Sequence, residues 1–131
     1  MATKSGVADA PVLWSGLLSS ANYSAADTYL FMKAGSASGE ATTASTGEEA
    51  IGIRQNKPAS GEPCLLAIHG VSLLKLGSGG ATHGNELKSD SSGQGVVSSA
   101  DREKVCAIAL ATGSEGDLIP VLVVHKDSSH A

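Results

Sequence analysis

Aromatic residues are scarce in this sequence of 131 residues: they make up 3% of it, as one Trp, two Tyr and one Phe. A domain of this length buries roughly two thirds of its unfolded surface, so its core has to be built from Val, Leu, Ile and Ala. Such side chains pack well on pleated strands. The composition therefore favours a β-rich fold, or a thinly filled protomer that completes its core by oligomerising.

Positive charge is sparse as well. Nine Lys and Arg residues are scattered along the chain against 13 Asp and Glu residues, which leaves a net charge of −4. Proteins that bind nucleic acid through its phosphates need clustered basic side chains, and the sequence contains no basic run. We therefore expect no nucleic-acid partner.

Long hydrophobic runs are absent too. The longest, residues 118–124, is far shorter than the roughly 20 residues that a membrane-spanning helix needs. Residues 1–16 contain one Lys but no continuous apolar stretch, so they do not read as a secretory leader. We expect no membrane partner, and synthesis in the cytoplasm.

Cysteine is limited to Cys64 and Cys106, which both lie in apolar segments. A buried free cysteine behaves as a small hydrophobic residue, so packing in the core is the favoured interpretation of both. A disulfide between them stays open, because they lie at comparable places in two similar segments and the sequence does not decide the pairing.

Motifs that carry chemistry are missing. His69, His83, His125 and His130 do not have the spacing of a zinc site. The glycine-rich stretch 77–80 is not followed by the Lys and Ser or Thr of a phosphate-binding loop, and no Gly-x-Ser-x-Gly elbow is present. We therefore expect no catalytic, cofactor-binding or metal-binding residues, and a protein that is not an enzyme.

What the chain does contain is one hairpin pattern that occurs twice, in residues 51–69 and 106–124. Each copy has an apolar strand, a polar stretch, a Gly followed by a carboxylate (Gly61-Glu62 and Gly116-Asp117) and a second apolar strand. Gly accepts a positive φ, and an acidic side chain can bind nearby backbone amides. We therefore interpret both carboxylates as turn residues rather than as a catalytic pair, and the chain as a β scaffold.

Turn-forming residues recur at short intervals after residue 50, which predicts an all-β fold: a small sandwich or barrel of short strands with an extended N-terminal arm. Strands 104–110 and 118–125 are apolar at nearly every position and should be buried on both faces. Pro120 cannot donate a ladder hydrogen bond, so we expect it at an edge position or a bulge. The predicted strands are 50–54, 63–69, 71–76, 86–88, 95–98, 104–110 and 118–125.

The first part of the chain is different in composition. Residues 1–11 are small and polar, like a flexible arm, and residues 35–48 read as a loop or linker of Gly, Ser, Thr and Ala. Residues 22–32 fit a short helix or a strand. The predicted domains are an N-terminal arm and linker with a short apolar patch at 1–48, a β-rich domain at 49–126, and a disordered tail at 127–131.

All the aromatic residues (Trp14, Tyr23, Tyr29 and Phe31) precede residue 32. Large rigid side chains are common anchors of interfaces, although they could equally cap the open end of a small core. The candidate binding residues therefore lie in the apolar patch around the Trp: Pro11, Val12, Leu13, Trp14, Leu17 and Leu18.

One set of features extends along about residues 50–125. It consists of an Ile-Gly-Ile strand, a Gly-Glu loop, a strand that ends in Gly-Val, a middle turn with Asn85, and a closing strand after a Gly-Asp turn. These features lie at residues 51–53, 61–62, 70–71, 84–88 and 116–121. In this order they resemble the small capsid decoration (cement) proteins of tailed bacteriophages, in which Asp is usual at the position of Asn85.

The resemblance implies a virion protein on the outer surface of an icosahedral head, commonly a homotrimer, that bridges neighbouring subunits of the major capsid protein. Such a protein stabilises the shell against the pressure of the packaged DNA and needs no active site or cofactor. We expect the patch from Pro11 to Leu18 to attach it to the capsid. The alternatives are a phage tail or receptor-binding module that recognises a surface glycan, or a small hydrolase that uses His69 or His125 with a carboxylate.

Overall fold

The computed structural model describes residues 11–128, and all regular elements within this range are strands, which confirms the all-β prediction. No helix that could cross a membrane occurs in this part of the chain. The strands are β1 (Val12–Ser19), β2 (Phe31–Ala34), β3 (Glu40–Thr43), β4 (Gly52–Arg54), β5 (Pro63–Lys75), β6 (Glu86–Ser89), β7 (Gly95–Val97), β8 (Lys104–Ala109) and β9 (Leu118–Asp127).

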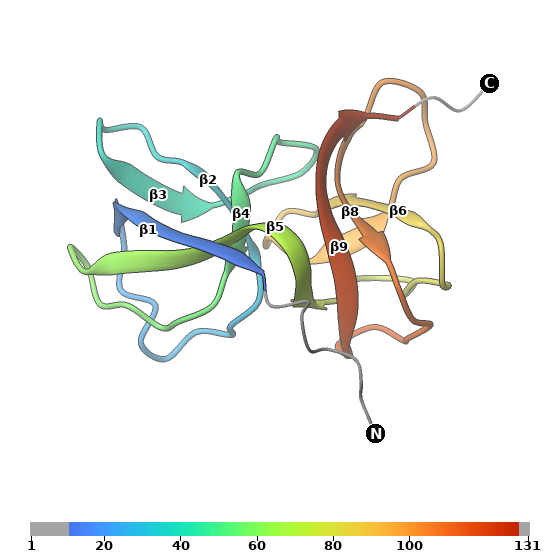
Figure 1. The fold of residues 1–131 in the computed structure, drawn as a ribbon, viewed down its shortest axis with the longest axis horizontal. Coiled ribbons are helices and arrows are strands. Elements are labelled where there is room, and N and C mark those ends of the chain that lie inside the picture. Colours follow the sequence, from blue (N-terminus) through green and yellow to red (C-terminus); the bar gives the residue numbers. More distant parts are fainter. Residues whose placement is uncertain (1–10, 129–131) are drawn as a thin grey trace.

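The strands form two small barrels that share the long strand β5 (Figure 1). In the first barrel the order is β1-β3-β2-β4-β5, and pairing of β1 with β5 closes the ring. In the second the order is β5-β9-β8-β6-β7, and a parallel bridge between Leu76 and Gly95 closes it. The first half of β5 pairs with β1 and β4, and the second half pairs with β9.

The long strand β5 was predicted as two strands separated at Gly70. It is continuous, and Gly70, with a φ of 86°, lies where β5 passes from one barrel to the other. Glycine accepts this conformation without steric strain. The residue that reads as a break in the sequence therefore joins the two barrels.

The two barrels have the same topology. In the first barrel β1 pairs antiparallel with β5 and parallel with β3, and β2 pairs with β3 and β4. In the second barrel β5 pairs antiparallel with β9 and, through the bridge after its end, parallel with β7, and β6 pairs with β7 and β8. The registers correspond as well: Ile53 lies opposite Ala67 in the first barrel, and Ile108 lies opposite Leu122 in the second. One supersecondary unit therefore occurs twice.

The repeated hairpin of the sequence is the pair of fourth and fifth strands in each barrel. Its two turns have the same geometry: Glu62 Oε1 accepts the amide of Ala59 at 2.8 Å, and Asp117 Oδ2 accepts the amide of Ser114 at 2.8 Å. The glycines that precede the carboxylates have φ values of 83° and 88°. Both carboxylates are turn residues, as predicted.

Each barrel has its own apolar interior. In the first it consists of Met32, Ala41, Cys64 and Leu66. In the second a larger cluster includes Leu74, Leu76, Leu87, Ile119 and Val121, and it extends into the contact with the first barrel. The two clusters explain why aromatic side chains are dispensable for most of the core.

Both cysteines are buried and free, which confirms the packing interpretation. They are not at comparable places, however, because Cys106 corresponds to Ile51 in the matched registers of the two barrels. Cys64 lies inside the first barrel, whereas Cys106 lies in the cluster that joins the barrels.

Within the segment predicted as arm and linker, residues 12–43 contribute three strands to the first barrel. The prediction of a loop over residues 35–48 was wrong for β3. Ala41 is fully buried there, and in so narrow a barrel a small side chain fills an inward position. Of the predicted tail, Asp127 ends β9 and Ser128 is 3% exposed. Residues 1–10 and 129–131 of the predicted arm and tail lie outside the described residues.

Burial of β9 on both faces was a wrong prediction. Its side chains alternate, with Ile119 and Val121 buried but Leu118 and Leu122 exposed by 49% and 37%. Pro120 lies in an interior strand rather than at a sheet edge. It is tolerated because it lies at the end of the β8–β9 ladder: its carbonyl accepts the amide of Leu110 at 3.0 Å, one residue beyond β8, and its missing N–H removes one terminal bond of that ladder.

Candidate functional site

The predicted binding patch lies on β1, which is a wall of the first barrel rather than a free arm. Val12 is 55% exposed, and Leu13, Trp14 and Leu18 are 45–46% exposed. Leu17 instead packs against the interior cluster of the first barrel, and Pro11 is half-buried. Four of the six predicted residues thus present apolar surface to solvent along one strand.

Trp14 lies against the backbone of Gly16. A Cβ atom at residue 16 would be 2.1 Å from Cζ2 of the indole, so a side chain there would displace the ring. The absence of a side chain at Gly16 therefore allows this ring position. The sequence interpretation missed Gly16, and the signal that could have revealed it is the Trp-x-Gly spacing inside an apolar segment.

One edge of β1 is largely unpaired. β1 pairs with β5 from Val12 to Leu18, but with β3 only at Leu18 and Ser19. Residues 12–16 therefore have no strand partner on the side of β3 within residues 11–128. Such an edge can accept an extended segment of another chain, and here it lies beside exposed apolar side chains.

Two candidate histidines come together at the start of this patch. His69 lies opposite Val12, and its ring meets that of His125 edge-to-face with 5.9 Å between the centroids. His125 Nε2 is 3.1 Å from the carbonyl oxygen of Ile68. The hollow beside His125, next to Glu49 and Asp127, has a volume of about 40 Å³, which is room for about one water molecule.

Metal ligands do not gather in the described part of the chain: no three His, Cys, Asp or Glu side chains there are placed to hold a metal ion. His83 is exposed, and its amide donates to Thr112 Oγ1 at 3.1 Å. His130 lies outside the described residues. The three described histidines are thus exposed residues of β5, β9 and a turn.

A wider hollow of about 250 Å³ lies where the two barrels meet. Asp27, Thr28, Tyr29, Lys75, Gly116 and Leu118 line it. Lys75 Nζ is 2.5 Å from Asp27 Oδ2, and this hydrogen bond, with the charge of the lysine, lowers the pKa of Asp27. The ion pair satisfies both charges, so the hollow offers no uncompensated group to a ligand.

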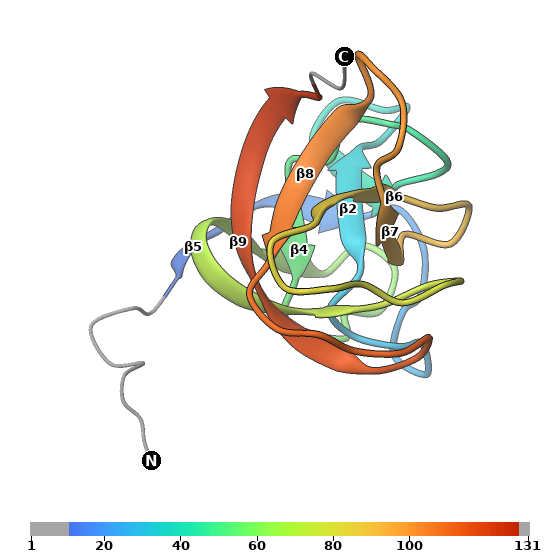
Figure 2. The same ribbon diagram turned by 90° about the vertical axis from the view of Figure 1, so that its right-hand side faces the viewer.

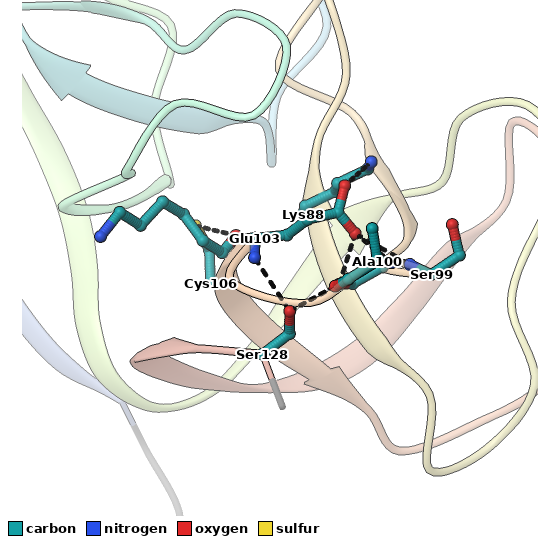
Figure 3. A network of polar contacts seen from close by, with 8 residues as sticks. Lys88, Ser99, Ala100, Glu103, Cys106 and Ser128 are labelled. Atoms are coloured by element: carbon teal, nitrogen blue, oxygen red, sulfur yellow. Dashed lines mark hydrogen bonds and ion pairs between the residues drawn. The ribbon is translucent and has the colours of Figure 1, made fainter. Parts of the chain in front are cut away.

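The densest polar network holds the second barrel together (Figure 3). Glu103 Oε1 accepts from Ser98 Oγ and from the amides of Ser99 and Ala100 at 2.8–2.9 Å, while Oε2 pairs with Lys88. The hydrogen bond from Lys88 and those from the loop lower the pKa of Glu103 to about 2. Ser128 Oγ in turn accepts the amide of Glu103 at 2.9 Å.

The first barrel contains the counterpart of this network. Lys33 Nζ lies 2.6 Å from Glu48 Oε2, and Glu48 Oε1 accepts the amide of Ser45 at 2.6 Å. These bonds lower the pKa of Glu48. Both networks fix a loop onto a strand, so their role is to stiffen each barrel rather than to bind a substrate.

No protein-family model matches the sequence, and no curated protein sequence matches it significantly. Among solved structures, the chain is similar in fold to the head fiber gp8.5 N base of bacteriophage phi29, with a TM-score of 0.69. The two chains are 14% identical, and the match covers 91% of this chain and 98% of the phage chain. At this coverage the likeness extends over both barrels.

Proposed function

We propose that this protein is a bacteriophage head decoration (cement) protein that binds the outer capsid surface as a homotrimer. In this role it bridges neighbouring subunits of the major capsid protein and stabilises the shell. The observation that carries the proposal is the similarity of nearly the whole chain to a phage head fiber base. The resemblance of residues 50–125 to cement proteins supports the same assignment.

The attachment surface in this proposal is the exposed face of β1. Complete burial of a large apolar side chain contributes about 1.5–3 kcal/mol. The four exposed side chains of β1, including Trp14 and Leu18, are already about half covered, so each has roughly half of that gain left. A trimer presents three such patches, and simultaneous binding multiplies modest affinities through effective concentration.

The stiffness of the two barrels suits this role. A protein that bridges capsid subunits has to transmit load through its own body, and both barrels are closed rings of strands with loops fixed by ion pairs. Because β1 belongs to one of these rings, its residues are held in place before binding. Attachment therefore costs little of the ordering entropy that a flexible arm would lose.

The alternatives have less support in the geometry. A glycan-binding module stacks sugars on exposed aromatic rings, but Phe31 is fully buried and Tyr23 stacks on Arg54 with 4.3 Å from Cζ to the ring centroid. A hydrolase that uses His125 would need room for a substrate, and the hollow beside it holds about 40 Å³. Tyr29 is half-buried and packs against the core cluster. Trp14 is therefore the most exposed aromatic residue of the described chain, and one such ring suits a protein contact.

Binding to undecorated heads tests the proposal. Deletion of residues 1–18 would remove a strand that closes the first barrel, so substitutions on the surface of β1 are the sharper tool. We expect Trp14→Ser and Leu18→Ser to reduce occupancy on heads at least tenfold. A matched control, Val97→Ser, changes an apolar residue of similar exposure (37%) on the second barrel and should bind normally. Unchanged binding of both β1 variants would contradict the role of the patch.

A further inference from the structure

The contact between the two barrels inside one chain provides a template for a contact between chains. The first barrel buries its outer face against the second, with Phe31 and Ile53 fully buried. The edge of the second barrel that receives this face includes Ser89, Gly93 and Cys106. The amide of Phe31 donates to the Gly93 carbonyl at 2.8 Å, and that of Gly47 to the Ser89 carbonyl at 3.0 Å.

The matching outer face of the second barrel is exposed and apolar. Ile108 corresponds to Ile53 of the first barrel, and Leu122 corresponds to Ala67. Both residues of the first barrel are fully buried. Cross-strand pairs join Val71 and Ile108 to Leu122, and Leu73 to Pro120, whereas Leu118 lies opposite Lys75 at the end of the face. We call it the β9 face: Val71, Leu73, Ile108, Leu118, Pro120 and Leu122.

The β9 face has the character of an interface rather than of an ordinary surface. Leu73, Leu118 and Leu122 are 38%, 49% and 37% exposed, and none of its six residues is charged or polar. Contiguous apolar surface of this kind marks binding sites on soluble proteins. In Figure 2 β5, β9 and β8 curve side by side along one flank of the second barrel.

The first barrel carries the other half of the contact. The receiving residues of the second barrel, Ser89, Gly93 and Cys106, correspond to Ala34, Gly39 and Ile51 in the matched registers. Ala34 and Gly39 are exposed and Ile51 is half-buried. One chain therefore has an uncovered outer face on its second barrel and an uncovered receiving edge on its first.

We propose that the β9 face binds the receiving edge on the first barrel of a second copy of this chain, so that the contact inside one chain is repeated between chains. The proposal deepens the homotrimer of the proposed function by naming its surfaces. A contact between two different surfaces is heterologous and closes into a ring when the rotation between copies allows it. The contact between chains differs from the one inside a chain at one position. Phe31 of the first barrel corresponds to Glu86 of the second, whose carboxylate pairs with Lys126 at the rim of the β9 face.

The test is the molar mass of the full chain in solution, measured by light scattering after size exclusion, without any capsid. The wild type is expected as an oligomer, and Leu122→Glu, which places a charge in the β9 face, as a monomer. Ala34→Glu, on the receiving edge, is expected to have the same effect. Trp14→Glu, at a residue of 46% exposure on β1 that does not pair with β3, is the matched control and should keep the wild-type mass.

Mixing the two monomeric variants distinguishes a head-to-tail contact from a symmetric one. Leu122→Glu keeps an intact receiving edge and Ala34→Glu keeps an intact β9 face, so the mixture should form a heterodimer. A wild type that stays monomeric, or a Leu122→Glu variant that is folded by circular dichroism but keeps its oligomer mass, would overturn the proposal. A wild-type oligomer that does not bind heads would contradict the proposed function alone.

Discussion

Arg54 and Ala109 occupy the same position in the two barrels, opposite Leu66 and Val121, respectively. Arg54 is fully buried, and its burial lowers the pKa of the guanidinium. Its Nε donates to the Asn56 carbonyl at 2.9 Å, and its Nη2 donates to the carbonyl of Asp27. The first barrel thus uses one long polar side chain where the second uses a small apolar one.

Arg54→Ala is expected to destabilise the protein by about 3–5 kcal/mol, because it creates a cavity and removes the donor of two carbonyl groups. Chemical denaturation followed by circular dichroism measures the change. Lys57→Ala, a nearby exposed position, is the matched control and should cost less than about 0.5 kcal/mol. A loss for Arg54→Ala as small as that of the control would show that the arginine is not a structural part of the barrel.

The stability of the second barrel should depend on pH through Glu103. Its pKa is about 2 in the folded chain against 4.5 as the ordinary value, so its contribution is present above pH 4.5 and is lost as the pH falls from about 4.5 to 2. Glu103→Gln should be about 1–2 kcal/mol less stable at pH 7, after allowance for solvent screening.

Thermal unfolding of the wild type and Glu103→Gln between pH 7 and pH 2.5 tests this account. The difference in Tm between the two should narrow as the pH falls. Glu115→Gln, at an exposed turn, should behave like the wild type throughout. A constant difference across the range would assign the effect to something other than the ionised carboxylate.

Gly16→Ala should displace the indole of Trp14 while leaving the barrel folded. The chain has one Trp, so its fluorescence reports this ring directly, and we expect a shift of the emission maximum. Binding to heads should weaken several-fold, because the apolar patch changes shape. Ser15→Ala is the neighbouring control. An unchanged spectrum for Gly16→Ala would contradict the described contact between the ring and residue 16.

Gly61→Ala and Gly116→Ala test the repeat itself. Both glycines have a positive φ, and a Cβ at either would meet no atom within 4 Å. The expected cost is therefore backbone strain alone, about 1 kcal/mol, and equal in the two barrels. Chemical denaturation of the two variants gives the comparison. A large difference between the two would mean that the turns are not equivalent.

The second half of the fold was predictable from the sequence because it follows local rules. Short apolar segments and the turn-forming residues between them located β6 to β9 to within a few residues, as well as the shared hairpin. The first half was harder to predict. β3 is made of small residues, and its position depends on pairing with β1 and β2, which no local pattern contains.

Four of the six candidate residues are exposed, and their role in binding stays a prediction; the strand that holds them was not predicted. Trp14 and Leu18 looked like parts of an arm because the strand that holds them pairs with β5, far along the chain. The exposure of the β9 face was missed for a related reason. A strand with apolar residues on both faces predicts burial of both. The sequence pattern is the same when the second face is covered within the chain and when it is exposed for a partner.

The most direct test of the central claim is electron cryo-microscopy of heads assembled without this protein and then incubated with the purified chain. We expect density of the double-barrel shape at regularly repeated sites on the outer surface, with β1 facing the shell. Heads incubated with Trp14→Ser should have much weaker density at these sites. Heads without added density, or density confined to the tail, would contradict the account.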